Sequence, residues 1–192
     1  MNKFTERLRS IYADIGNGWV EKNEFVFSEA KTCGLALAGS IGGAVASKKA
    51  KKIPGDIDFV CRNVGQAMRF HARLQDKLLQ YPTFWQIQIN NRTKFCPENV
   101  ETHLRFHAPF WLPVCVFVLK DGRFRQWFTP EAYPVQLFED VKREAKEMEK
   151  RDGKERRVLE EPVVDFVSSQ DDDVFFGGGT PLAAKAYPAP MS

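Results

Sequence analysis

Two short apolar segments with a basic loop between them give the clearest pattern in the sequence. The first, Leu35–Ala38, ends at Gly39, and the second is Ile57–Val60. The first is a short apolar run that stops at turn residues, and the second is a short segment of mostly apolar residues after Gly55; both are typical of buried strands. Small residues fill Ile41–Ala46 between them, as in a helix that packs closely against its neighbours. We therefore expect a strand, a helix and a second strand over positions 35–60.

The remaining elements follow from the periodicity on either side of this segment. Apolar residues at helical spacing predict helices, whereas alternation or a continuous short apolar run predicts strands. We expect helices over Lys3–Tyr12, Gln66–Tyr81 and Val135–Lys150, and strands over Phe84–Ile89, Glu101–Ala108, Val114–Leu119 and Arg123–Phe128, the last entered by a hairpin turn at Asp121-Gly122. Positions 19–27 fit either a helix or a strand, and positions 90–99 fit a polar loop. The expected fold class is α/β, with helices flanking a mixed sheet.

Composition indicates one globular domain followed by a tail. The chain has 192 residues, of which 43% are hydrophobic, enough for a sizeable core. We expect the domain to span residues 1–167 and a flexible tail to span residues 168–192, because that end holds three consecutive aspartates, three consecutive glycines and several prolines. A net charge of +3 does not by itself indicate nucleic-acid binding.

The sequence favours a cytoplasmic protein with reduced thiols. Its four cysteines form no C-x-x-C pair, and two of them lie inside apolar runs, so we expect buried thiols rather than disulfides. No signal peptide and no apolar stretch of about 18 residues is recognisable, so we expect no membrane partner. The pattern gives no indication of oligomeric state.

Candidate chemistry concentrates at the ends of the two apolar segments. Gly39-Ser40 ends the first expected strand and opens a helix, where free backbone N–H groups and a hydroxyl can hold phosphate. Asp56 and Asp58 are two positions apart, so on a strand both side chains leave the same face. Two carboxylates that close repel each other unless a divalent cation lies between them. A phosphate cradle beside a metal-binding pair indicates chemistry on a nucleoside triphosphate.

Gly39-Ser40 followed by Asp56-x-Asp58 resembles the nucleotidyltransferase superfamily of DNA polymerase beta and its minimal relatives. The resemblance covers about Phe25 to Leu119. It implies a nucleotidyltransferase-like fold in which Asp56 and Asp58 are catalytic and bind Mg²⁺ or Mn²⁺, while Gly39 and Ser40 bind the nucleotide. The implied reaction moves a nucleoside monophosphate from an NTP, such as ATP, to an acceptor. The sequence does not say whether that acceptor is a nucleic acid, a protein or a small molecule.

The resemblance also implies a third carboxylate, on the strand next to the one that carries the aspartate pair. The strand of the right type is Val114–Leu119, and the position expected to hold the acid is occupied by Cys115. Cysteine is a poor ligand for magnesium, which prefers oxygen. Glu101, at the start of the preceding expected strand, is the candidate substitute as a catalytic residue.

Four lysines lie between the two motifs, at positions 48, 49, 51 and 52. A run of charge usually faces water, so a solvated loop is one interpretation. The other is that the lysines reach a polyphosphate or a nucleic acid, since they are tethered beside the expected site. On this second interpretation Lys52 joins the nucleotide-binding residues.

Two alternatives stay open at the level of sequence. Because Cys115 replaces an acid, the chain can also be a catalytically degenerate relative that acts as a nucleotide-binding or protein-interaction module. Separately, His103 and His107 share a strand face, but they lie about 13 Å apart and cannot share a zinc ion unaided. A zinc site would need Cys96 or Cys115 as well.

Overall fold

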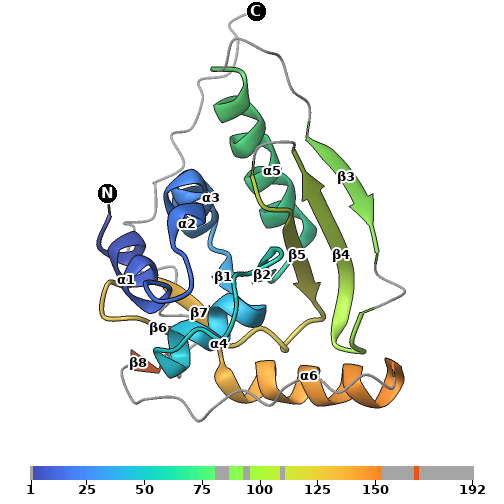
Figure 1. Ribbon diagram of the computed structural model, residues 1–192. Helices are drawn as coiled ribbons and strands as arrows, with labels where there is room; N and C mark the ends of the chain where they lie inside the picture. Colours follow the sequence, from blue (N-terminus) through green and yellow to red (C-terminus); the bar gives the residue numbers. More distant parts are fainter. Residues whose placement is uncertain (1, 81–86, 93–95, 109–110, 153–166, 169–192) are drawn as a thin grey trace, which may run out of the picture.

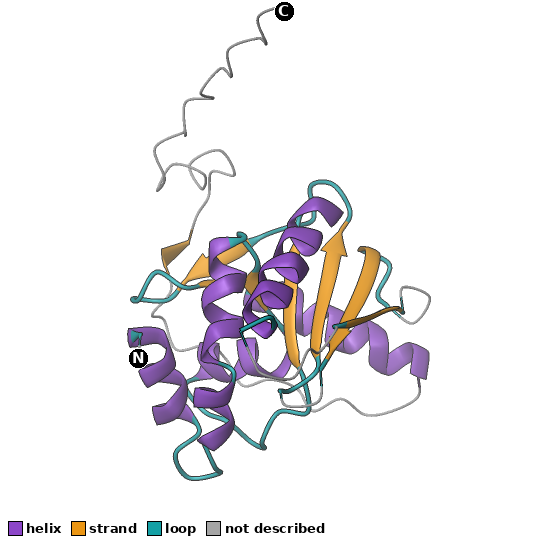
Figure 2. Cartoon of the chain, turned by 90° about the horizontal axis from the view of Figure 1, so that it is seen from above, coloured by secondary structure: helices purple, strands orange, loops and turns teal. Residues whose placement is uncertain are grey.

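A mixed sheet with helices on both sides forms the body of the molecule (Figures 1 and 2). The computed structural model describes residues 2–80, 87–92, 96–108, 111–152 and 167–168. The helices are α1 (Lys3–Ile11), α2 (Gly18–Lys22), α3 (Glu24–Thr32), α4 (Gly39–Ser47), α5 (Val64–Leu78) and α6 (Phe138–Asp152). The strands are β1 (Ala36–Leu37), β2 (Ile57–Cys61), β3 (Gln88–Asn91), β4 (Val100–His107), β5 (Val114–Leu119), β6 (Gln126–Phe128), β7 (Pro134–Gln136) and β8 (Val167–Ser168). The expected α/β class with a mixed sheet is confirmed.

The strand order of the sheet, within the described chain, is β3-β4-β5-β2-β1-β7-β6-β8. Two pairs are parallel, β2 with β5 and β1 with β7, and the other neighbours are antiparallel. The segment that dominates the sequence pattern therefore folds as expected, with β1, α4 and β2 in succession. It lies in the middle of the sheet, and β5 flanks β2.

The two faces of the sheet differ in character because side chains alternate along each strand. On one face, Phe59 of β2 contacts Phe27 of α3 and Phe70 of α5 at ring-centroid distances of 6.3 and 5.6 Å. Phe70 in turn contacts Phe106 of β4. This face carries the larger hydrophobic core, which the N-terminal helices complete. The preceding residue of β2, Asp58, belongs to the opposite face, where α4 and α6 lie close together.

An aromatic cluster anchors the N-terminal helices to the far half of the sheet. Phe4 of α1 stacks on Tyr133, which precedes β7, with ring centroids 3.7 Å apart. The Tyr133 hydroxyl donates to the carbonyl oxygen of Phe27 at 2.9 Å, so this buried polar group is satisfied. Burial raises the pKa of Tyr133 far above its ordinary value. The cluster fixes β7 beside β1 and thereby supports the start of α4.

Several boundaries differ from the sequence expectations. Positions 19–27 form two helices, α2 and α3, that meet at Asn23, whose side chain donates to the Trp19 carbonyl oxygen. The expected helix over Val135–Lys150 begins only at Phe138, because residues 134–136 form β7 and Val135 pairs with Leu37 of β1. That pairing joins positions far apart in the sequence, so local periodicity could not reveal it.

The expected hairpin after β5 is wrong, because the strand that follows the turn does not pair with β5. Gly122 does adopt the left-handed conformation of a turn, with φ of +69°. The chain then crosses to the other half of the sheet, where β6 pairs with β7 and β8 and not with β5. A salt bridge from Arg125 to Asp140, at the start of α6, holds this crossing segment. The long β5 is instead paired on both sides by β2 and β4.

The edge strand and the tail are described only in part. The first half of the expected strand Phe84–Ile89 lies outside the described residues, and the observed β3 begins at Gln88 and runs into the expected polar loop. The expected tail lies outside the described residues from position 169 on, and its first residue, Ser168, pairs with Trp127 in β8. The four cysteines are all free, and all except Cys96 are buried. No helix in the described ranges is long and apolar enough to cross a membrane.

Candidate functional site

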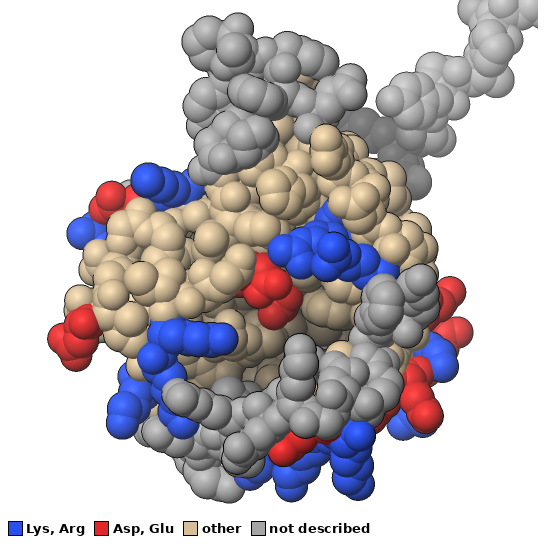
Figure 3. All heavy atoms as spheres, turned by 45° about the vertical axis from the view of Figure 1, so that its right-hand side comes forward, with Lys and Arg blue, Asp and Glu red and all other residues tan. Residues whose placement is uncertain are grey.

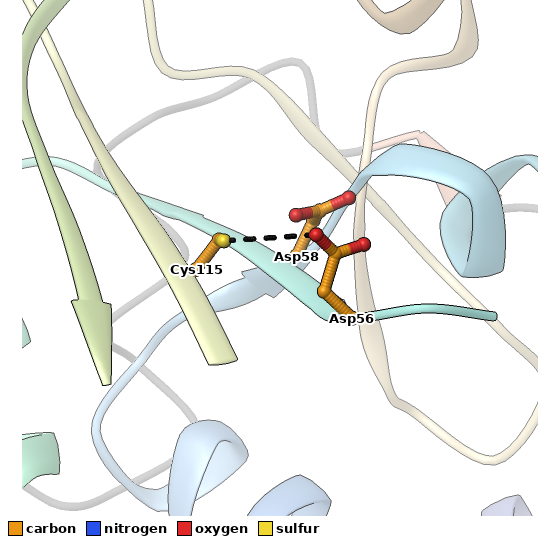
Figure 4. A group of neighbouring side chains, drawn as sticks. All are labelled: Asp56, Asp58 and Cys115. Carbon is orange, nitrogen blue, oxygen red and sulfur yellow. Dashed lines mark hydrogen bonds between the residues drawn. The ribbon is translucent and has the colours of Figure 1, made fainter. Parts of the chain in front are cut away.

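Asp56, Asp58 and Cys115 form a compact group at the centre of one face (Figure 4). Each side chain offers one ligand-type atom, and these atoms all lie within 4.8 Å of one another. Asp58 lies in β2, whereas Asp56 lies just before the strand, which begins at Ile57. Asp56 thus lies one residue before the observed strand, as it does before the expected strand Ile57–Val60. The two carboxylates nevertheless lie close together on the same side.

Cys115 holds the position on the neighbouring strand that faces the aspartate pair. In the parallel ladder Asp58 is the register partner of Cys115. The Cys115 thiol is directed at Oδ2 of Asp56, with the sulfur 4.0 Å from that oxygen. Burial raises the pKa of the Cys115 thiol far above its ordinary value, and the negative charges of Asp58 and Asp56 raise it further. The thiol is therefore protonated and acts as a donor toward Asp56.

The start of α4 lies directly against Asp58. Gly39 has φ of +58°, and a Cβ atom added to it would collide with the Asp58 carboxylate. The preceding residue, Ala38, caps the helix without a side-chain hydrogen bond, and its own N–H donates to the Asp58 carbonyl oxygen at 2.8 Å. The first N–H groups of a helix have no partner within the helix, so those of α4 are available to an anion. Ser40, the next residue, is exposed.

A cleft of about 1000 Å³ opens over this group. One wall comprises the start of α4 and the loop that follows the helix, including Gly39, Ser40, Lys49, Lys51 and Lys52. Figure 3 shows an acidic patch at the centre of this face with basic side chains on either side of it. Lys52 is exposed and lines the cleft, as the nucleotide-binding interpretation requires. The basic loop therefore borders the site rather than lying away from it.

The opposite wall and the floor are largely apolar. Val60 of β2, Phe117 of β5 and His103 of β4 are register partners across three strands and line the cleft together. His103 stacks on Phe117 with ring centroids 4.3 Å apart and an interplanar angle of 16°. Burial is the main cause that lowers the pKa of His103 to about 4, and the charges of Arg92 and Arg105 lower it further. The imidazole is therefore neutral at pH 7.

Helix α6 closes one side of this apolar wall. Val141, Ala145 and Met148 line the cleft from α6. Glu144 of the same helix accepts hydrogen bonds from Asn99 Nδ2 at 2.7 Å and from Gln136 Nε2 at 2.9 Å. These bonds tie α6 to the sheet on both sides of the site. The sequence indicated a helix here but gave no sign that it borders the aspartate pair.

Glu101 does not reach the aspartate pair. It is exposed, lies at a register shift near the start of β4 and does not line the cleft. The β4 residue paired with Cys115 is Arg105. Glu101 is four strand positions from Arg105, which corresponds to about 13 Å. The structure therefore brings Asp56 and Asp58 together with Gly39, Ser40 and Lys52, and leaves Glu101 apart.

The zinc alternative does not assemble either. Over the ranges that the structure describes, the group of Asp56, Asp58 and Cys115 is the only one with the spacing of metal ligands. Cys115 is in that group, but neither His103 nor His107 is. His103 faces the cleft, whereas His107 is exposed near the far end of β4.

Comparison with known proteins adds no family to these observations. No protein-family model matches the sequence, and no curated protein sequence matches it significantly. The assignment of function therefore rests on the geometry of the cleft.

Proposed function

We propose that the protein is a metal-dependent nucleotidyltransferase that moves a nucleoside monophosphate from an NTP to an acceptor. The observation that carries this proposal is the contact between Gly39 and Asp58. A helix N-terminus able to hold phosphate and a carboxylate able to hold a cation touch each other directly. A nucleoside triphosphate with its divalent ion has both charges at that spacing.

The triphosphate fits along the start of α4. The first N–H groups of the helix and the Ser40 hydroxyl supply donors, and Lys49, Lys51 and Lys52 supply positive charge at the same wall. The nucleoside would then extend over the apolar part of the cleft. A volume of about 1000 Å³ is at the upper end of the range for small-molecule pockets, so an acceptor can be held as well.

Two of the three candidate metal ligands, Asp56 and Asp58, fit Mg²⁺ or Mn²⁺. The carboxylates of Asp56 and Asp58 offer the hard oxygen ligands that these ions prefer, whereas the thiol of Cys115 does not suit magnesium. When bound, the ion would neutralise charge on the phosphates and align them for displacement. The residues of the chain contribute position. Asp56 and Asp58 fix the ion site, and the start of α4 fixes the phosphates beside it.

The proposed step is an in-line displacement at the α-phosphorus. The acceptor hydroxyl oxygen forms a bond to that phosphorus while the bond to the bridging oxygen of the β-phosphate breaks, and pyrophosphate leaves with both bonding electrons. The hydroxyl proton passes to water in the open cleft, because among the described residues the position facing Asp58 on β5 holds a thiol and not a carboxylate. Positioning is then the main contribution of the protein to the rate.

Cys115 favours a second candidate function, a module that binds a nucleotide but does not transfer a nucleoside monophosphate. A protonated, buried thiol cannot accept the proton of an acceptor hydroxyl, and it is a weak ligand for magnesium. Such a module would keep the phosphate cradle and the aspartate pair. It would bind the NTP with metal and release no pyrophosphate.

Pyrophosphate release separates the two candidates. Wild-type protein would be incubated with each of the four NTPs, with Mg²⁺ or Mn²⁺, and with a panel of hydroxyl-bearing acceptors. We expect metal-dependent release that Asp56→Asn abolishes. The matched change Asp76→Asn, at an exposed position of α5 across the sheet, should leave the release intact. NTP binding without release by the wild-type protein would assign the chain to the second candidate instead.

A further inference from the structure

Two arginines stand on the sheet face beside the aspartate pair. Arg105 of β4 is the register partner of Cys115, which is itself the partner of Asp58, so the three side chains leave the same face in one row. Arg92 follows β3 and lines the cleft, and its backbone N–H donates to the carbonyl oxygen of His103. Both guanidinium charges act on the same buried groups, since they lower the pKa of His103 and oppose the rise at Cys115.

Neither arginine is neutralised within the described chain. The arginines seen in ion pairs include Arg7, Arg9, Arg73, Arg125 and Arg143, and no ion pair found among the described residues includes Arg92 or Arg105. Arg105 is only half-exposed, so its charge lies partly away from bulk water. A guanidinium group at the edge of a cleft, without a carboxylate partner, is well suited to bind an external phosphate through paired hydrogen bonds.

The position of these arginines separates them from the phosphate cradle. The basic loop and the start of α4 lie on one side of Asp58, toward β1, whereas Arg105 lies on the other side, beyond β5. Two strand spacings place the Arg105 backbone about 10 Å from that of Asp58. Arg92 lines the cleft on this second side, and Arg105 lies beside the cleft on β4 without lining it, so basic residues stand on both sides of the aspartate pair. Figure 3 shows basic side chains on either side of the central acidic patch.

In-line displacement assigns the two sides to different substrates. The attacking and leaving oxygens lie on opposite sides of the α-phosphorus. With the leaving pyrophosphate at the start of α4, the acceptor must approach from the side of β5, β4 and β3. We propose that Arg92 and Arg105 bind a phosphate of the acceptor, so that the acceptor is a phosphate-bearing molecule with a nearby hydroxyl.

This inference rests on the proposed function only in identifying the bound molecule as the acceptor. The phosphate site itself can be tested without it. The probes are inorganic phosphate, ribose 5-phosphate and a short single-stranded oligonucleotide, which separate free phosphate, a phosphate monoester and a phosphodiester. Their binding would be measured by calorimetry at two salt concentrations, for wild type, Arg92→Gln, Arg105→Gln and the double variant. Arg69→Gln is the matched control, because it removes the same charge from an exposed position of α5 across the sheet. A non-hydrolysable NTP analogue with Mn²⁺ is measured in parallel.

We expect at least one phosphate probe to bind wild type and the control alike. The double variant should bind it about tenfold or more weakly, and each lost arginine should lower the salt slope by about 1. Binding of the NTP analogue should be unchanged. If the analogue fails to bind wild type while the probes still depend on the arginines, the phosphate site stands and nucleotidyl transfer does not. Equal loss of NTP binding in the arginine variants would overturn the inference, and so would probe binding that is absent from wild type or unaffected by the double change.

Discussion

Asp58 of β2 and Cys115 of β5 are register partners in a parallel strand pair, so a carboxylate and a protonated thiol share one face of the sheet. Asp56 completes the group from the turn before β2. The cysteine therefore lies where a third carboxylate would complete an all-oxygen set of ligands. This single position separates a site that can hold a divalent ion from one fully adapted to magnesium.

Replacing the thiol should improve the site for magnesium. Cys115→Asp adds an oxygen ligand beside Asp56 and Asp58, and we expect Mg²⁺-dependent pyrophosphate release to rise about tenfold, or about 1.4 kcal/mol in the barrier. Without metal, the variant should melt at a lower temperature than wild type because three carboxylates repel one another. Cys115→Ser, which adds no charge, is the control. Equal rates for the aspartate and serine variants would show that position 115 does not contact the metal.

The close approach of α4 to Asp58 leaves no room for a side chain at position 39. Gly39→Ala would place a methyl group against the Asp58 carboxylate and force an alanine to adopt φ of +58°. We expect a loss of about 1–3 kcal/mol in the free energy of unfolding, together with loss of metal-dependent NTP binding. Gly55→Ala is the matched control, because it is next to Asp56 but faces open space. Chemical denaturation measures the free energy of unfolding of both variants. Equal stability of Gly39→Ala and Gly55→Ala would contradict the close contact.

The hydroxyl of Ser40 should contribute to phosphate binding. Ser40→Ala removes one donor at the start of α4 without disturbing the core, because the residue is exposed. We expect NTP affinity to fall about tenfold, as for one charge-assisted hydrogen bond of about 1.5 kcal/mol. Ser28→Ala, at an exposed position of α3, is the control for a serine removed elsewhere. Calorimetric titration that finds the same NTP affinity for Ser40→Ala and wild type would remove Ser40 from the site.

His103 should make the fold sensitive to mild acid. Its pKa is about 4 in the folded chain, mainly because of burial, and about 6.5 when unfolded. Between these values the unfolded chain binds more protons, so stability falls as the pH drops from about 6.5 to 4. His103→Phe keeps an aromatic ring against Phe117 and removes this dependence. Melting temperatures across that range should fall less steeply for the variant, whereas parallel curves would contradict the assignment.

Local patterns predicted the centre of the fold well. Leu35–Ala38 is a short apolar run bounded by glycines, and Ile57–Val60 is a short, mostly apolar segment after Gly55-Asp56. They fold as β1 and β2 on either side of α4 in the sequence. The apolar run Val114–Leu119 predicted a central strand, and the family resemblance implied its place beside the aspartate strand; it folds as β5 and pairs with β2. The two-residue spacing of Asp56 and Asp58 was enough to place their carboxylates together.

Long-range pairing accounts for the failures. Residues 134–136 form β7 and pair with β1, and residues 126–128 pair with β7 instead of with β5. Local periodicity indicates neither pairing. Glu101 was a reasonable substitute by residue type, but the register shift and the length of β4 set it apart from the site. Alternation along β4 did place His103 and Arg105 on one face. Only the register with Cys115 reveals that this face is that of the aspartate pair.

The central claim is that nucleotide and metal bind together at the aspartate pair, and thermal unfolding tests it most directly. ATP with Mn²⁺ at about 100 times its Kd should raise the Tm of wild type by about 5–10 °C, from a stabilisation of about 2.7 kcal/mol. Asp58→Asn should abolish this rise while the apo variant melts no lower than apo wild type, because a repelling carboxylate pair has been relieved. Asp76→Asn should retain the full rise. A wild-type rise in Tm for Asp58→Asn would contradict the account.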